Sequence, residues 1–171
     1  MQRGELATIS AIVVIATILL GIRTWEVLKP KEPDPGIPFY SNATPEVKQK
    51  AGKLIDNLQC KTCHNLWGRS LMQMTMNVPA PRLDGIGSLH SEEWFYKYFS
   101  SKNPQEILPS RLKKEFRMPS YAHLSDEDRH ILAAYMSSLK VEKWYLADTK
   151  KAEYEVLTGK TYPSGKEQTP K

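Results

Sequence analysis

The residues whose types and spacing could do chemistry stand together at Cys60-Lys61-Thr62-Cys63-His64. The chain has 171 residues and two cysteines, and a histidine directly follows the second cysteine. Three kinds of site use such a run: half of a zinc site, a redox-active dithiol, or an attachment point for haem. A structural disulfide is disfavoured, because the two cysteines are close together in sequence.

The rest of the chain decides among these three sites. A zinc site needs further cysteines or paired histidines, and no third cysteine exists. A thioredoxin-like dithiol accompanies a βαβ pattern, which the sequence lacks. The motif therefore predicts one covalently bound haem c, with Cys60 and Cys63 joined to its vinyl groups and His64 bound to its iron.

The sixth ligand of the iron decides what such a haem does. Methionine fills the coordination sphere and raises the reduction potential, which suits electron transfer, whereas an open position suits gas binding. Met118 precedes Pro119 in a loop about fifty residues after His64, far enough along the chain to return over the other haem face. We predict Met118 as the ligand. His123 is the alternative and would give a bis-histidine centre.

The other methionines and histidines are not expected to bind the iron. Met136 falls on the apolar stripe of a helix and is expected in the core, whereas His90 and His130 are expected at the surface. The methionines of residues 72–76 follow His64 too closely to reach the opposite haem face. Three thioethers also resemble a Cu(I) site, but no Cys or His lies among them, so we expect a loop beside the haem.

Three amphipathic helices must position these residues. Each begins at a typical N-cap, namely Thr44, Ser91 or Ser125, with proline or acidic residues directly behind it. Apolar residues then recur at helical spacing: Val47, Ala51, Leu54, Ile55 and Leu58; Trp94, Phe95, Tyr98 and Phe99; Ile131, Leu132, Tyr135, Met136 and Leu139. Proline and glycine mark long loops, and no period-two strand is predicted. The predicted fold class is all-α, with the haem completing a thin core.

The N-terminal region differs from the rest of the chain. Residues 6–22 carry no charge, and this length is at the lower limit for a transmembrane helix. A cleaved signal peptide is the alternative, but its apolar region is shorter and no A-x-A-like site ends this run. We expect a single membrane anchor at residues 1–28 and a proline-rich spacer at 29–43, followed by a haem domain at 44–140.

A C-terminal extension is expected at residues 141–171. Its apolar residues favour packing of one part on the haem domain or on a partner subunit: Trp144, Tyr145, Leu146, Tyr154, Val156 and Leu157. From Gly159 onward we expect disorder. The net charge is +5, but the basic residues are scattered among acidic ones, so no nucleic-acid partner is indicated.

Four stretches resemble class I cytochromes c, over residues 44–139. Gly52-Lys53-x-Ile55 is similar to the first helix of that family, and Ala80-Pro81-Arg82-Leu83 to a loop that usually reads Gly-Pro-x-Leu. Arg117-Met118-Pro119 resembles the loop that carries the methionine ligand, and residues 132–139 resemble the last helix. The resemblance implies a class I cytochrome c domain, and Ala80 is a departure from it.

The resemblance also implies roles for three residues. The Pro81 carbonyl would accept a hydrogen bond from His64 and fix its tautomer. Gly52 would let the first helix cross the last one closely near Tyr135. Trp94 could reach a haem propionate, although a core role is expected.

The expected function is electron transfer, without catalysis by this chain alone and without a small-molecule substrate. The order of anchor, spacer, haem domain and tail is similar to mono-haem subunits of nitric-oxide reductases and haem–copper oxidases. We expect a single-pass inner-membrane protein with its haem domain on the periplasmic side, where such haems are attached. A basic rim of Lys61, Lys113, Lys114 and Arg117 would steer an acidic redox partner. The alternative function is a haem-based sensor or ligand-binding domain with a displaceable sixth ligand.

Overall fold

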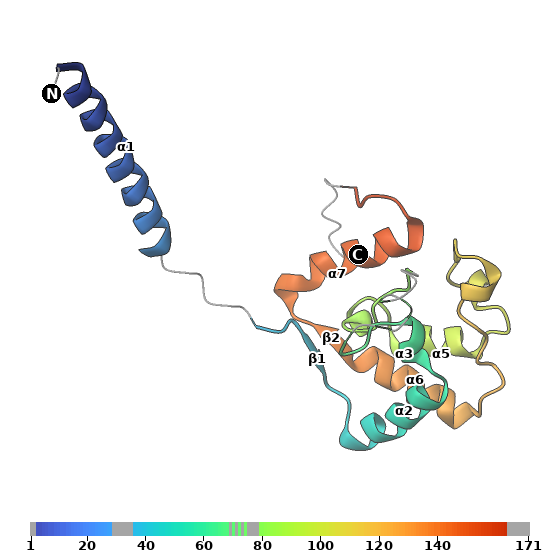
Figure 1. Cartoon of the computed structure of the whole chain (residues 1–171). Helices are drawn as coiled ribbons and strands as arrows, with labels where there is room; N and C mark the ends of the chain where they lie inside the picture. The colour runs from blue at the N-terminus through green and yellow to red at the C-terminus, as the bar shows by residue number, and fades with distance from the viewer. Residues whose placement is uncertain are drawn as a thin grey trace. The chain divides into compact units, whose positions relative to one another are not determined.

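The computed structural model describes residues 3–28, 36–68, 70, 72, 74 and 79–163. The chain forms two units with a boundary after Gly36 (Figure 1). The first unit contains helix α1, Arg3–Leu28. The second begins at Ile37, which lies inside the predicted spacer, and holds all the residues of the candidate haem site.

Between residues 11 and 25, helix α1 carries apolar side chains on every face. The large ones between residues 11 and 25 are exposed: Ile12, Val13, Val14, Ile15, Ile18, Leu19, Leu20, Ile22 and Trp25. The hydroxyls of Thr17 and Thr24 donate to carbonyls one turn back, so these polar groups are satisfied within the helix. Across the described residues, no helix combines the length and apolar character needed to span a membrane.

The three predicted amphipathic helices are present, each starting one residue after its predicted N-cap: α2, Pro45–Asn57; α5, Glu92–Ser100; α6, Asp126–Ser138. Each capping hydroxyl accepts a hydrogen bond from the backbone N–H three residues later, at 3.1–3.3 Å. These bonds satisfy N–H groups that have no partner inside the helix. The local sequence therefore fixes where all three helices begin.

The apolar stripes of these helices meet in one core. Helix α6 packs against both α2 and α5 (Figure 1). The buried hydrophobic residues of these three helices are Ala51, Ile55, Phe95, Tyr98, Phe99, Leu132, Ala133, Tyr135 and Met136. The predicted core position of Met136 is confirmed.

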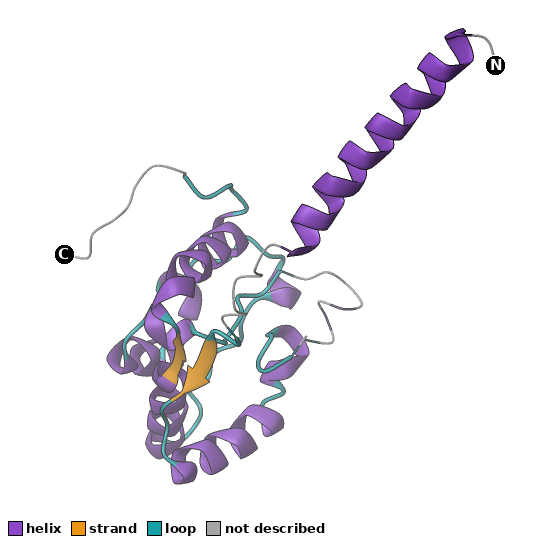
Figure 2. Ribbon diagram, turned by 90° about the vertical axis from the view of Figure 1, so that its left-hand side faces the viewer, coloured by secondary structure: helices purple, strands orange, loops and turns teal. Residues whose placement is uncertain are grey.

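A short antiparallel sheet, which the sequence did not indicate, joins the two ends of this core. Strand β1, Phe39–Ser41, pairs with β2, Leu139–Val141, and Phe39 lies opposite Val141 (Figure 2). Strands of three residues are too short to show an alternating pattern. The sheet ties the segment that enters the domain to the residues that directly follow α6.

The glycine that lets another segment approach α6 closely is Gly87 and not Gly52. A Cβ built on Gly52 meets nothing within 4 Å, so the role implied by the resemblance is wrong. Gly87 lies instead in the 3-10 helix η1, Ile86–Ser88, directly beneath the end of α6. A Cβ at Gly87 would lie 2.5 Å from the carbonyl oxygen of Met136 and would also clash with that of Ser137.

The C-terminal extension is largely helical. After the 3-10 helix η4, Lys143–Tyr145, helix α7 runs over Leu146–Thr158. The expectation of disorder from Gly159 onward is wrong for residues 159–163. Gly159 adopts a left-handed conformation with φ 68° and ends the helix, and the backbone N–H of Tyr162 donates to Glu155 at 3.1 Å. Residues 164–171, also expected to be disordered, lie outside the described residues.

Candidate haem-binding site

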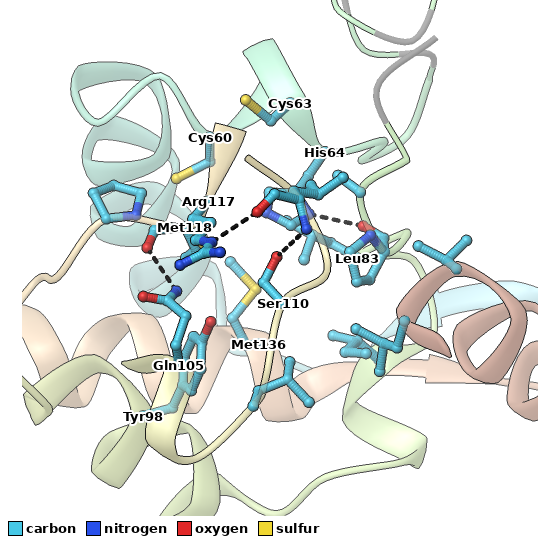
Figure 3. A pocket seen from close by; sticks show the side chains of 18 of the residues that line it. Cys60, Cys63, His64, Leu83, Tyr98, Gln105, Ser110, Arg117, Met118 and Met136 are labelled. Atoms are coloured by element: carbon cyan, nitrogen blue, oxygen red, sulfur yellow. Dashed lines mark hydrogen bonds between the residues drawn. The ribbon is translucent and has the colours of Figure 1, made fainter. Parts of the chain in front are cut away.

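The two cysteines and the histidine lie on a single tight turn. Helix α3, Cys60–Cys63, begins directly after Gln59. The left-handed backbone of Gln59 (φ 55°) separates α3 from α2. The backbone N–H of His64 donates to the Cys60 carbonyl at 3.0 Å and closes the turn. Both thiols are free and partly buried. One turn therefore presents both thiols and the imidazole at the same cavity (Figure 3).

The imidazole of His64 is held in one tautomer. Its Nδ1 lies 2.7 Å from the Pro81 carbonyl oxygen. A carbonyl only accepts hydrogen bonds, so Nδ1 carries the proton and Nε2 keeps a lone pair. Burial lowers the pKa of His64, although this hydrogen bond raises it in part. The neutral ring is the form that binds iron, and a hydrogen bond of this kind increases its basicity.

The loop that carries Pro81 is fastened to the attachment turn by a buried carboxylate. Asp84 is 1% exposed. It accepts the backbone N–H of Trp67 at 2.7 Å and the Nε of Arg82 at 2.6 Å. The backbone N–H of Leu83 also donates to the Asn65 carbonyl at 2.9 Å. No local pattern marks Asp84, because its partner Trp67 is distant in sequence.

These elements enclose a cavity of about 330 Å³. Its wall is mostly apolar and comes from the attachment turn, the loop after Pro79, helices α5, α6 and α7, and residues 105–119. Among the residues that line it are Cys60, Cys63, His64, Pro81, Trp94, Tyr98, Gln105, Arg111, Arg117, Met118, Met136, Glu153, Val156 and Leu157. A largely apolar cavity with a few placed polar groups suits a cofactor.

Met118 lies in the wall of this cavity, whereas His123 is exposed and does not line it. The loop before Met118 is shaped by its own hydrogen bonds (Figure 3). Arg117 Nε donates to the Leu112 carbonyl at 2.7 Å. Gln105 Nε2 donates to the carbonyl of Met118 itself at 3.1 Å. The sequence alone does not single out Gln105, because nothing local distinguishes it from an exposed polar residue.

The remaining methionines fall in different places. Met136 is buried on α6 and also lines the cavity. The sulfur of Met72 lies 3.5 Å from that of Cys63, and Met74 is exposed. Met76, the third member of the methionine run, lies outside the described residues. Met72 is therefore next to a thiol of the attachment turn. Met72 and Met74 have helical backbone, however, and not the expected loop conformation.

The histidines near helix starts differ from each other. His130 is exposed and stacks on Tyr96, as expected for a surface residue. His90 is not a surface residue: its ring stacks on Trp94 at 3.9 Å, and its Nε2 lies 2.9 Å from Glu153. The expectation failed because Glu153 belongs to α7, which the local sequence of His90 cannot reveal.

An aromatic stack forms one side of the cavity. Trp94 lies between His90 and Tyr98, with 5.1 Å between the ring centroids of Trp94 and Tyr98. Trp94 is partly buried and packs against the core, which agrees with its expected core role. Burial raises the pKa of Tyr98 to about 12, so its phenol stays neutral at physiological pH. The same stack places Trp94 in the wall of the cavity.

The residues present fit a covalently bound haem: two thiols, a neutral imidazole and an apolar cavity lie together. The sequence profile of the cytochrome c family matches residues 49–140, more than half of the chain. The chain belongs to the cytochrome c family. This cytochrome therefore carries one haem c, and Cys60, Cys63 and His64 fit the attachment motif of the family. No curated protein and no solved structure matches it.

Proposed function

We propose that this cytochrome is a single-haem electron carrier whose iron is held between His64 and Met118. Membership of the family implies electron transfer by a haem protein. The haem supplies one-electron chemistry by cycling between Fe(II) and Fe(III). The observation that carries the proposal is that Met118 lines the same cavity as the two thiols and His64.

The protein residues contribute positioning and exclusion of water. The Pro81 carbonyl orients His64, and Gln105 holds the backbone of Met118. A sulfur ligand raises the reduction potential and leaves no open position, which favours outer-sphere electron transfer over ligand binding. The exposed position of His123 favours Met118 over a bis-histidine centre.

Replacement of Met118 by alanine tests this assignment. The oxidised Met118→Ala protein is expected to lose the sulfur-to-iron charge-transfer band and to bind added cyanide more readily. The reduced variant is expected to bind carbon monoxide more readily. Met136→Leu is the matched control, because Met136 lines the same cavity and leucine has a similar volume. An unchanged band in Met118→Ala, or its loss in Met136→Leu, would defeat the assignment.

We further propose that the N-terminal unit anchors the cytochrome in the inner membrane as a single pass, with the haem domain on the periplasmic side. The uncharged run 6–22 and the exposed apolar side chains of α1 support the anchor. Val14→Asp with Ile18→Asp should shift the full-length chain from the membrane fraction to the soluble fraction. Each aspartate costs about 2.5 to 3.5 kcal/mol at a helix centre in a bilayer. Val14→Leu with Ile18→Leu is the control.

The same proposal places this cytochrome with a membrane oxidoreductase, as a subunit or as a tethered shuttle that meets an acidic partner. Three cations of the predicted basic rim, Lys113, Lys114 and Arg117, are exposed. Lys61 is paired with Asp56 at 3.0 Å, which weakens its contribution. Purification in mild detergent distinguishes the two arrangements, because a fixed subunit should copurify with its complex and a shuttle should not.

A further inference from the structure

Helix α7 lies outside the part of the chain that matches the cytochrome c family, yet it reaches the haem cavity. The family match ends at residue 140, and α7 begins at Leu146. Glu153, Val156 and Leu157 nevertheless line the same cavity as Cys60, Cys63 and His64. This cytochrome thus adds a wall to its cofactor site from its own C-terminal extension.

Two polar contacts fasten α7 to the haem domain. Glu153 accepts a hydrogen bond from His90 at 2.9 Å, and the side chains of both residues are largely buried. One turn further on, Arg111 Nε donates to the Val156 carbonyl at 3.1 Å. Arg111 comes from the loop that leads to Met118, so α7 is tied both to the aromatic stack and to that loop.

The two ends of α7 are fixed as well. At its start, Tyr145 packs edge-on against Phe39 of β1, with 5.5 Å between the ring centroids. At its end, the left-handed Gly159 lies beside Arg111, whose guanidinium would be 3.2 Å from a Cβ at that position. Contacts at both ends and in the middle hold the helix in one place beside the cavity.

Despite these contacts, no residue of α7 is fully buried. Val156 and Leu157 are partly exposed, and the surface they present belongs to the wall of the cavity. Apolar side chains gain stability by leaving water. A large apolar ligand in the cavity is in the right place to cover these two side chains, and in this family that ligand is haem c.

We propose that α7 is a haem-covering helix, in which Val156 and Leu157 lie against the porphyrin while the His90–Glu153 pair latches the helix to the domain. The proposal rests on the electron-transfer function proposed above. Water stabilises the more highly charged ferric haem, so a wall that excludes water raises the reduction potential. The same wall blocks small reactants from one side of the haem.

The test replaces both wall residues in the full-length haem protein, as Val156→Ser with Leu157→Ser. The matched control is Lys151→Ser with Ala152→Ser, on exposed positions of the same helix that do not line the cavity. The wall variant is expected to have a lower midpoint potential than the control and a several-fold higher second-order rate constant for oxidation by ferricyanide. Haem content should equal that of the unsubstituted protein.

Amide hydrogen exchange provides a readout that does not depend on electron transfer. Amides of α7 should be protected in the unsubstituted haem protein and in the control, and should exchange several-fold faster in the wall variant. Equal potentials, rates and exchange in the two variants would overturn the proposal. An unsubstituted protein that cannot be reversibly reduced would instead defeat the electron-transfer function, and the exchange data would still decide the placement of α7.

Discussion

Asp84 is the residue that joins the attachment turn to the loop holding His64. Its carboxylate accepts two hydrogen bonds at 2.7 and 2.6 Å, from the Trp67 backbone and from Arg82. Asp84→Asn keeps the shape but removes the charge and replaces one acceptor oxygen with a donor. We expect a loss of about 2 to 3 kcal/mol in the free energy of unfolding, measured by urea denaturation, since buried charge-assisted hydrogen bonds have this magnitude.

An exposed carboxylate gives the control for Asp84. Glu127 pairs with Lys50 at 3.4 Å, and both side chains are solvent-exposed. Glu127→Gln should change the unfolding free energy by less than about 0.5 kcal/mol, because exposed ion pairs contribute little. Similar losses in the two variants would mean that Asp84 does not brace the loop.

Tyr98 should make stability depend on alkaline pH. Burial raises its pKa to about 12, whereas an unfolded tyrosine ionises near pH 10. Its contribution is therefore complete below about pH 10 and is lost as the pH rises toward 12, with a total of about 2 to 3 kcal/mol. Urea denaturation across this range should show a steeper fall for the unsubstituted protein than for Tyr98→Phe. Parallel curves would contradict this prediction.

At the scale of residues, the site is predictable from the sequence where a single motif contains all the reactive groups. The motif of Cys60, Cys63 and His64 carries its own geometry, because three side chains on one turn need no distant partner. Asp84 and Glu153 could not be found in this way, since each is defined by a residue that only folding brings near. The hydrogen bond from His64 to Pro81 was expected from resemblance, and it is present at 2.7 Å.

At the scale of elements, two glycines should respond oppositely to the same substitution. Gly87→Ala places a Cβ against the last carbonyls of α6 and should destabilise the protein by about 1 to 3 kcal/mol or more. Gly52→Ala meets nothing within 4 Å inside α2 and should stabilise it by about 0.5 to 1 kcal/mol. Thermal denaturation of both variants checks the sign, and a loss of stability at Gly52 would restore its role in helix crossing.

The elements also differ in how far local sequence determines them. The starts of three helices are predictable from local sequence, because each capping hydrogen bond spans only three residues: those of Thr44, Ser91 and Ser125. The pairing of β1 with β2 joins segments about a hundred residues apart, and each is too short to carry its own pattern. For α7, the apolar Val156 and Leu157 predicted that the segment packs on another surface. Which surface they face depends on the contacts of α7 with His90 and Arg111, which are distant in sequence.

At the scale of the whole molecule, the net charge of +5 predicts how ionic strength affects electron exchange. Reaction with the anion ferricyanide should slow as salt is added, because exposed cations near the Met118 loop attract it. Lys113→Gln with Lys114→Gln should lower the rate at low salt several-fold and flatten this dependence. Lys53→Gln with Lys143→Gln removes the same charge elsewhere, and an equal effect from both pairs would show that only net charge matters.

The sheet between β1 and β2 has a mechanical consequence for this cytochrome. Any pull on the N-terminal segment enters the haem domain through Phe39–Ser41, and the antiparallel partner strand follows directly from α6. The tension thus acts on the C-terminal end of α6 before it reaches the attachment turn. The short β1–β2 ladder therefore lies between the N-terminal segment and the attachment turn, so a pull on that segment would load the ladder before it reaches the haem-binding residues.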